Sequence, residues 1–220
     1  MKRVITKFIK IVAIYLLFIS SVCAEKLLVF NFTEEELNSL DVRKVRGADA
    51  KTLYSIGKNE NGNYLKAVAE NAASGIGKEI KINLDKTPFI NITWKIEKDL
   101  KGVKENTKKG HDFAARVFVI KKTGATPLSN RAINYVFSSN SNVGKTWPSP
   151  YTKKSVDRVL ASTKSNLNEW VTVKANVKED FKKFHDLNVD ELSGIAIMAD
   201  TDNSKLTAVS YYQNIFFTSE

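Results

Sequence analysis

The chain contains a single cysteine, Cys23, among 220 residues. It lies in the first 24 residues, which have the three parts of a secretory signal: a basic start, an apolar run over residues 11–19 and small side chains before Glu25. We expect a signal peptide over residues 1–24 that is cleaved after Ala24. The mature chain then holds no cysteine, which excludes disulfide bonds and thiol catalysis, and its stability must come from a buried apolar core.

Long apolar runs are also lacking. The run over residues 11–19 is shorter than the ~20 residues that a bilayer-spanning helix needs, and no later stretch is as apolar. A lipid anchor at Cys23 is the weaker alternative, because Val22 stands where a lipoprotein signal has a small residue. We therefore predict a periplasmic or secreted protein with no transmembrane segment in the mature chain. The sequence predicts no particular oligomeric state.

Signatures of catalysis are scarce. The two histidines, His111 and His185, stand in neither an HExxH nor a His-x-His spacing, and the G-x-S-x-G motif of a nucleophile elbow does not occur. Nothing in the sequence marks two of its 24 acidic residues as opposed across a cleft. The one pair worth testing as acid and base on a glycan is Asp112 with Asp200 or Asp202. The sequence therefore favours a protein without catalysis.

Acidic residues are outnumbered by basic ones. The formal charge is +10, and without the four basic groups of the first 24 residues it is +6. Lysines gather in one stretch, at Lys95, Lys98, Lys101, Lys104, Lys108 and Lys109. A solvated loop is the favoured interpretation, and a surface for an anionic glycan, a lipid headgroup or nucleic acid is the alternative. We predict no nucleic-acid partner, because no arginines are interleaved with aromatic residues in the way that stacks bases.

The sequence is rich in period-two alternation of β-branched and aromatic residues between turns of Gly, Asn, Ser and Asp. The alternation predicts half-buried strands over residues 89–97 and 170–177. Further strands are expected at 26–32, 51–57, 63–70, 76–84, 112–121, 131–139, 156–162, 192–199 and 206–217. Two short helical pieces are expected, one at the capping box from Thr33 to Glu36 and one over residues 179–186. With no Pro- or Ser-rich linker, the pattern predicts one domain over residues 25–220, a mainly β, antiparallel β-sandwich of jelly-roll type with one or two short helices.

Polar side chains share one face of a predicted strand. Over residues 112–121, Asp112 and Arg116 point one way with only a small alanine between them, while Phe113 points the other way with Val117. A carboxylate and a guanidinium placed like this can grip a polyol or carboxylate ligand, and Asn134 joins them if its strand is a neighbour. The alternatives without a ligand are a structural ion pair between Asp112 and Arg116 and a polar outer face for the strand of Asn134. The sequence favours these alternatives.

The turn that contains Asp200, Asp202 and Asn203 is rich in oxygen ligands. It fails the EF-hand template, which needs glycine where Lys205 stands and glutamate where Tyr211 stands. We predict no cofactor. A looser calcium site built from several loops stays open as an alternative to a hairpin whose side chains cap their own backbone.

The segment WPSPY, from Trp147 to Tyr151, places two aromatic rings on a stiff, extended backbone. Rigid exposed rings suit stacking on sugars. They suit capping the end of a sandwich equally well, because tryptophan is amphipathic and often partly buried.

Six motifs follow one another along the chain: DFAARVFVI at 112–120, INYVFSS at 133–139, the WPSPY segment, the tryptophan at 170, DFKKF at 180–184 and IMADTDNS at 197–204. Together they resemble the bacterial domain-of-unknown-function family 3047, from about residue 27 to residue 217. The resemblance implies an exported or envelope domain with no established activity, whose motifs place polar residues here at Asp112, Arg116, Asn134, Asp200, Asp202 and Asn203. His111 and Gln213 stand where the family has acids, which argues against a complete carboxylate or calcium cluster.

These observations predict a periplasmic or secreted β-sandwich that binds a saccharide or another envelope polyol. The candidate ligand-binding residues are Asp112, Arg116, Asn134, Trp147, Asp200, Asp202 and Asn203. A glycan-active enzyme with paired carboxylates and a structural envelope protein are the alternatives. The prediction depends on these side chains coming together when the chain folds.

Overall fold

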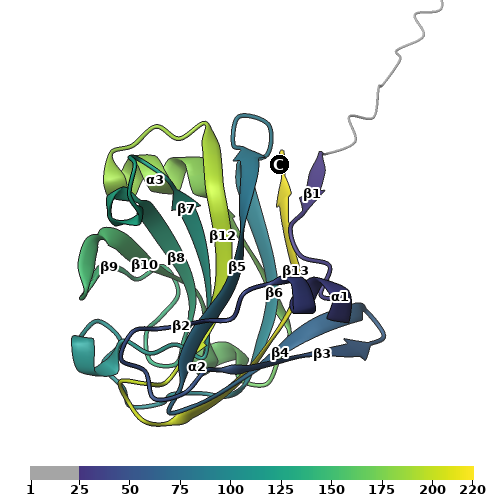
Figure 1. Ribbon diagram of the computed structural model, residues 1–220, viewed down its shortest axis with the longest axis vertical. Coiled ribbons are helices and arrows are strands. Elements are labelled where there is room, and N and C mark those ends of the chain that lie inside the picture. The colour runs from purple at the N-terminus through teal and green to yellow at the C-terminus, as the bar shows by residue number, and fades with distance from the viewer. Residues whose placement is uncertain (1–24) are drawn as a thin grey trace, which may run out of the picture.

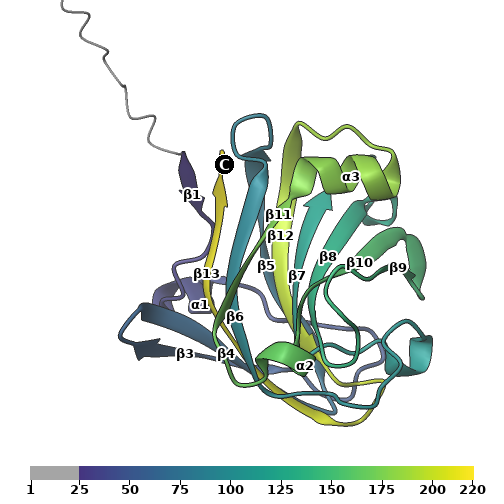
Figure 2. The ribbon, with the colours of Figure 1, turned by 180° about the vertical axis from the view of Figure 1, so that it is seen from behind.

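Two packed β-sheets make up the computed structural model, which describes residues 25–220 (Figure 1 and Figure 2). The first sheet contains, in order, β11 (Val171–Asn176), β6 (Phe89–Lys98), β13 (Thr207–Thr218), β4 (Gly62–Glu70) and β3 (Leu53–Asn59), with β1 (Lys26–Leu28) paired to β13. The second sheet contains β2 (Arg43–Lys44), β5 (Ala73–Asn83), β12 (Glu191–Asp200), β7 (Ala115–Lys121), β8 (Arg131–Ser138), β10 (Thr152–Ser162) and β9 (Thr146–Ser149).

Helices are few and short: α1 (Glu34–Ser39), α2 (Thr163–Asn166) and α3 (Val177–His185), with 3-10 turns η1 (Lys108–Gly110) and η2 (Pro127–Ser129). The predicted mainly β sandwich of jelly-roll type is confirmed. One strand pair departs from the antiparallel prediction, because β8 and β10 run parallel. The predicted signal peptide and its cleavage site lie outside the described residues. Within residues 25–220, no helix combines the length and the apolar character that crossing a bilayer requires.

The core lies between the two sheets, where the predicted alternation sets the inward side chains. In β6, Ile90, Ile92, Trp94 and Ile96 are all fully buried. The Trp94 ring lies 5.5 Å from the ring of Phe137, which comes from β8 in the opposite sheet. Burial of such large side chains stabilises residues 25–220, which contain no cysteine.

Some element bounds differ from those expected. The strand predicted over 112–121 begins only at Ala115, so the alternation expected for Asp112 and Phe113 does not hold. Phe113 packs with Val136 and Val159 on the outer face of the second sheet, whereas Val117 belongs to the main core. The chain leaves the strand pattern here because side-chain hydrogen bonds, described below, tie this segment to the β12–β13 turn. The predicted helix start is confirmed, since the Thr33 hydroxyl accepts the N–H of Glu36.

Four connections gather at one end of the sandwich, which we call the loop end. They are residues 99–114 between β6 and β7, 139–145 between β8 and β9, α2, and the β12–β13 turn at 201–206. Figure 1 and Figure 2 show α2 and the β12–β13 turn at the lower end, opposite α3 and the β5–β6 turn. Several predicted site residues lie in or next to these connections.

Candidate functional site

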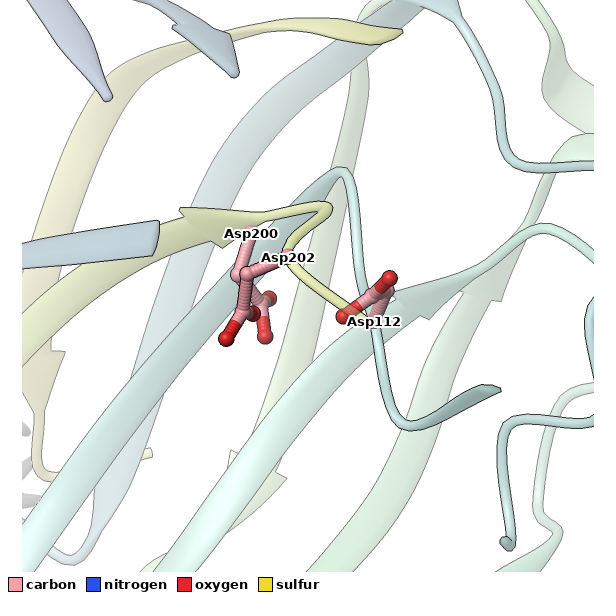
Figure 3. Close-up of side chains that lie close together, drawn as sticks. All are labelled: Asp112, Asp200 and Asp202. Atoms are coloured by element: carbon pink, nitrogen blue, oxygen red, sulfur yellow. The ribbon is translucent and has the colours of Figure 1, made fainter. Parts of the chain in front are cut away.

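Three carboxylates that are distant in sequence meet at the loop end. Asp112 lies just before β7, Asp200 ends β12, and Asp202 lies in the turn that follows. Each offers one oxygen within 4.8 Å of the others, and Figure 3 shows Asp200 and Asp202 side by side with Asp112 approaching from its own segment. Asp112 and Asp200 are almost fully buried, at 0% and 2% exposure, whereas Asp202 is half-buried. We call these three residues the carboxylate cluster.

Asp112 holds the β12–β13 turn in place. Its Oδ1 accepts the side-chain amide of Asn203 at 2.8 Å and the Asn203 backbone N–H at 3.2 Å, and its Oδ2 accepts the N–H of Ser204 at 2.6 Å. The turn is therefore capped largely by a carboxylate from a neighbouring segment, and not by side chains of the hairpin alone as one interpretation of the sequence had it.

Asp200 is the partner of Arg116. The guanidinium donates to Asp200 Oδ2, and the N–H of Phe113 donates to Oδ1 at 3.1 Å. Arg116 therefore pairs with Asp200 and not with Asp112, the partner suggested by spacing along a strand. The pKa of the Asp200 carboxyl is raised overall, and burial is the largest cause. The Arg116 guanidinium lowers this pKa, and the nearby Asp112 carboxylate raises it. Burial, followed by Asp112, also raises the pKa of Asp202.

The two buried carboxylates of the cluster are hydrogen-bonded to donors of the protein itself. An acidic cluster braced in this way gives no independent reason to place a cation in it. The cluster lines neither of the two grooves described below.

A second buried network lies on the same outer face of the second sheet. The side-chain amide of Asn134 donates to Asp157 at 2.7 Å, and His111 Nε2 lies 2.8 Å from the other oxygen of Asp157. Asp157 has no exposure at all. Asp157 was not among the residues predicted from the sequence, although an acid directly after Val156, in the strand expected over residues 156–162, was a usable signal. These contacts tie residues 99–114 to β8 and β10.

The structure thus brings the candidate residues together, but most of them point inward. Asp112, Arg116, Asn134 and Asp200 are each at most 4% exposed and bonded within the protein. They position the surrounding loops. Trp147, Asp202 and Asn203 reach the surface.

Trp147 lies on β9 above the buried networks. Its ring stacks on Phe113 with centroids 6.5 Å apart and an interplanar angle of 18°. The His111 ring meets Phe113 and Tyr151 edge-on, and the Tyr151 hydroxyl lies 2.6 Å from Asn203 Oδ1. The WPSPY segment therefore does cap the sheet, and it leaves Trp147 partly exposed and Tyr151 exposed.

Trp147 forms one wall of a surface groove of about 450 Å³, which we call the Trp147 groove. The residues that give it its chemical character are Lys104, Glu105, Asn106, Asn140, Ser141, Asn142, Lys145, Thr146 and Lys164. A larger groove of about 840 Å³, the Leu206 groove, shares Val103 and Lys104 with it and continues past Asn203 to Leu206. The segment that contains Val103 and Lys104 therefore borders both grooves.

Glu105 connects the lysine-rich loop over residues 99–114 to the end of strand β8. It is 3% exposed and accepts from the Ser138 hydroxyl, the Ser139 N–H at 2.8 Å and the Asn140 N–H at 3.2 Å. Asn140 in turn accepts the N–H of Gly102 at 2.6 Å. Sequence reasoning missed Glu105, because an acid in a lysine-rich stretch is normally solvated.

Comparison with protein families gives one match, to the protein of unknown function family DUF3047, over residues 38–216. The chain belongs to the DUF3047 family. No curated protein matches it in sequence. In this DUF3047 protein the two departures from the family pattern lie outside the carboxylate cluster: His111 binds Asp157, and Gln213 donates to Asn59 at 2.7 Å.

Several solved structures resemble this DUF3047 protein over most of its length. A mutant family 29 carbohydrate binding module in complex with mannohexaose has 10% identity and a TM-score of 0.41, over 90% of this chain and 94% of that one. A thermostable cellulase derived from Cel12A of Rhodothermus marinus has 8% identity and a TM-score of 0.45, over 89% and 100%. The xyloglucanase domain of NopAA from Sinorhizobium fredii, in complex with cellobiose, has 12% identity and a TM-score of 0.44, over 81% and 92%. Likenesses this low assign no ligand or activity to the DUF3047 protein.

Proposed function

We propose that the protein is an exported binding protein for a saccharide or a similar polyol, and that the Trp147 groove is its binding site. Export is inferred from the signal pattern of residues 1–24. The binding site is inferred from the groove, where a partly exposed tryptophan stands beside one amide and two hydroxyls that form no hydrogen bond within the described part of the chain.

These polar groups are the observation on which the proposal rests. Among the hydrogen bonds between residues 25–220, none involves the side chains of Asn106, Ser141 or Thr146, although all three line the groove. Amides and hydroxyls both donate and accept, as sugar hydroxyls do, so each can form a reciprocal hydrogen bond with a polyol. A volume of about 450 Å³ lies within the range of small-ligand sites.

Trp147 supplies the apolar part of such a site. Its ring is held against Phe113 before any ligand arrives, so little side-chain freedom is lost on binding. The C–H face of a sugar ring packs on an indole as other apolar surfaces do. The buried networks contribute by fixing the loops from which the groove is built.

Replacing Trp147 by alanine is expected to weaken saccharide binding about 100-fold, as loss of a central aromatic contact does at other binding sites. We suggest screening the exported protein on a broad glycan array and titrating the strongest ligand by calorimetry. The matched control is Trp170→Ala. Trp170 is also a partly buried tryptophan, but it lies on the outer face of the first sheet, where it packs on Tyr64 and Tyr211.

A second variant separates binding from folding. Asn106→Ala removes an exposed amide that bonds to no other described residue, so the fold should be unaffected, while affinity should fall by about tenfold with the lost hydrogen bond. If Trp147→Ala and Asn106→Ala both bind as tightly as the unmodified protein, the groove is not the site. If no glycan on the array binds, saccharide recognition is ruled out for this protein and the structural alternative gains support.

A further inference from the structure

We infer that the saccharide is anionic and that Lys104, Lys145 and Lys164 of the Trp147 groove bind its charged groups. The inference rests on the proposed function, because it names the class of ligand for the same groove.

The charge of the groove is strongly one-sided. Lys104, Lys145 and Lys164 line it from three different connections, namely the β6–β7 loop, the β8–β9 loop and α2. All three are exposed, and no ion pair among residues 25–220 involves any of them. Three lysines from separate segments thus meet at one concavity without acidic partners.

The single acid of the lining does not offset this charge. Glu105 is 3% exposed, and its two oxygens accept hydrogen bonds from Ser138, Ser139 and Asn140. Its carboxylate therefore points into the protein, and the ammonium groups face the solvent. Like charges at the rim of a concave, low-dielectric surface reinforce one another and attract a ligand of opposite sign.

The basic surface continues beyond this groove. The Leu206 groove contains Lys104 again, together with Lys108 and Lys109, and its lining has no acid. No ion pair between described residues uses Lys108 or Lys109 either. A ligand that spans both grooves must be longer than one sugar, which favours an oligosaccharide with several charges.

The chemistry of the lining favours such a glycan over other polyanions. Lysine binds single oxyanions as a point charge, whereas the groove lacks the arginines that grip phosphate in a bidentate way or stack on bases. Beside the lysines stand the unused amide of Asn106 and the hydroxyls of Ser141 and Thr146. These groups match the hydroxyls of a sugar, and a headgroup on a flat lipid surface would leave them unpaired.

The test uses the full-length gene product after export and compares two probes of the same backbone, an oligogalacturonate and its neutral methyl ester. We expect the oligogalacturonate to bind more tightly, and its affinity to fall with ionic strength. The triple variant Lys104→Gln, Lys145→Gln, Lys164→Gln should weaken its binding by about tenfold, the effect of three partly solvated charge contacts, and should weaken binding of the ester clearly less. A sulfated dextran oligosaccharide, which has no carboxylate, serves as the sulfate arm and distinguishes sulfate from carboxylate as the charged group.

The matched control carries the same loss of charge elsewhere: Lys58→Gln, Lys86→Gln, Lys183→Gln, three exposed lysines without ion pairs that lie outside both grooves. Equal weakening by the two triple variants would overturn the inference, because net charge alone would then explain binding. Equal binding of the ester and the oligogalacturonate would overturn the inference while leaving the proposed function intact. Failure of all saccharide probes would end both, and binding only to phosphatidylglycerol vesicles would replace the glycan by a lipid surface.

Discussion

Replacing Asp200 by alanine is expected to lower the free energy of unfolding by about 3–5 kcal/mol, the usual consequence of removing one partner of a buried ion pair. The substitution leaves the Arg116 guanidinium buried without an acceptor, since Arg116 is 4% exposed and bonds to Asp200. It also removes the acceptor of the Phe113 N–H. Chemical denaturation followed by tryptophan fluorescence measures the change.

Two further variants test this explanation. Asp200→Ala combined with Arg116→Met should recover much of the lost stability, because no buried charge is then left unpaired. Asp49→Ala is the matched control: it breaks the exposed 2.9 Å pair with Lys205 and should leave the unfolding midpoint unchanged. If the double variant is no more stable than Asp200→Ala alone, the cost does not arise from the unpaired guanidinium.

Replacing Glu105 by alanine is expected to lower the free energy of unfolding by about 3 kcal/mol and to abolish binding in the Trp147 groove, because buried donors lose a charged acceptor. The donors are the Ser138 hydroxyl and the N–H groups of Ser139 and Asn140. Without the Glu105 carboxylate, these bonds between residues 99–114 and the end of β8 are lost and the connection is weakened. Denaturation gives the stability, and calorimetry with the ligand found by the array gives the binding.

Glu105→Gln separates charge from shape in this network. It keeps one acceptor oxygen and the size of the side chain, so it should fold better than Glu105→Ala while still being less stable than the unmodified protein. An unfolding midpoint for Glu105→Ala that matches the unmodified protein would show that the carboxylate does not hold the two loops together. Lost stability combined with unchanged affinity would show that the network does not shape the groove.

Local patterns predicted the elements well where one face of a strand meets the core. The alternation in residues 89–97 set both the extent of β6 and its inward face, with Trp94 fully buried. The alternation rule failed at Asp112 and Phe113 because the rule assumes that the strand continues. There the Asp112 carboxylate bonds to Asn203 and Ser204, which are about 90 residues away.

Of the residues that line the Trp147 groove, only Trp147 was predicted from the sequence. For the buried residues beneath it, proximity was predictable but the pairing was not. The polar motifs correctly pointed to Asp112, Arg116 and Asp200 as residues that meet, while the choice of Asp200 as the partner of Arg116 depends on β7 and β12 being neighbours. The parallel pairing of β8 with β10 likewise depends on how the sheet is assembled. Glu105 has no local signature at all, because the donors that bury it belong to a different loop.

Strand β9, which carries Trp147, is one of the two edge strands of the second sheet. An outermost strand exposes unpaired backbone groups and invites another chain to add to it. Pro148, the neighbour of Trp147, has no N–H to offer, and Pro150 follows two residues later. The prolines thus disfavour the addition of further strands at this edge, where the aromatic ring of Trp147 is displayed.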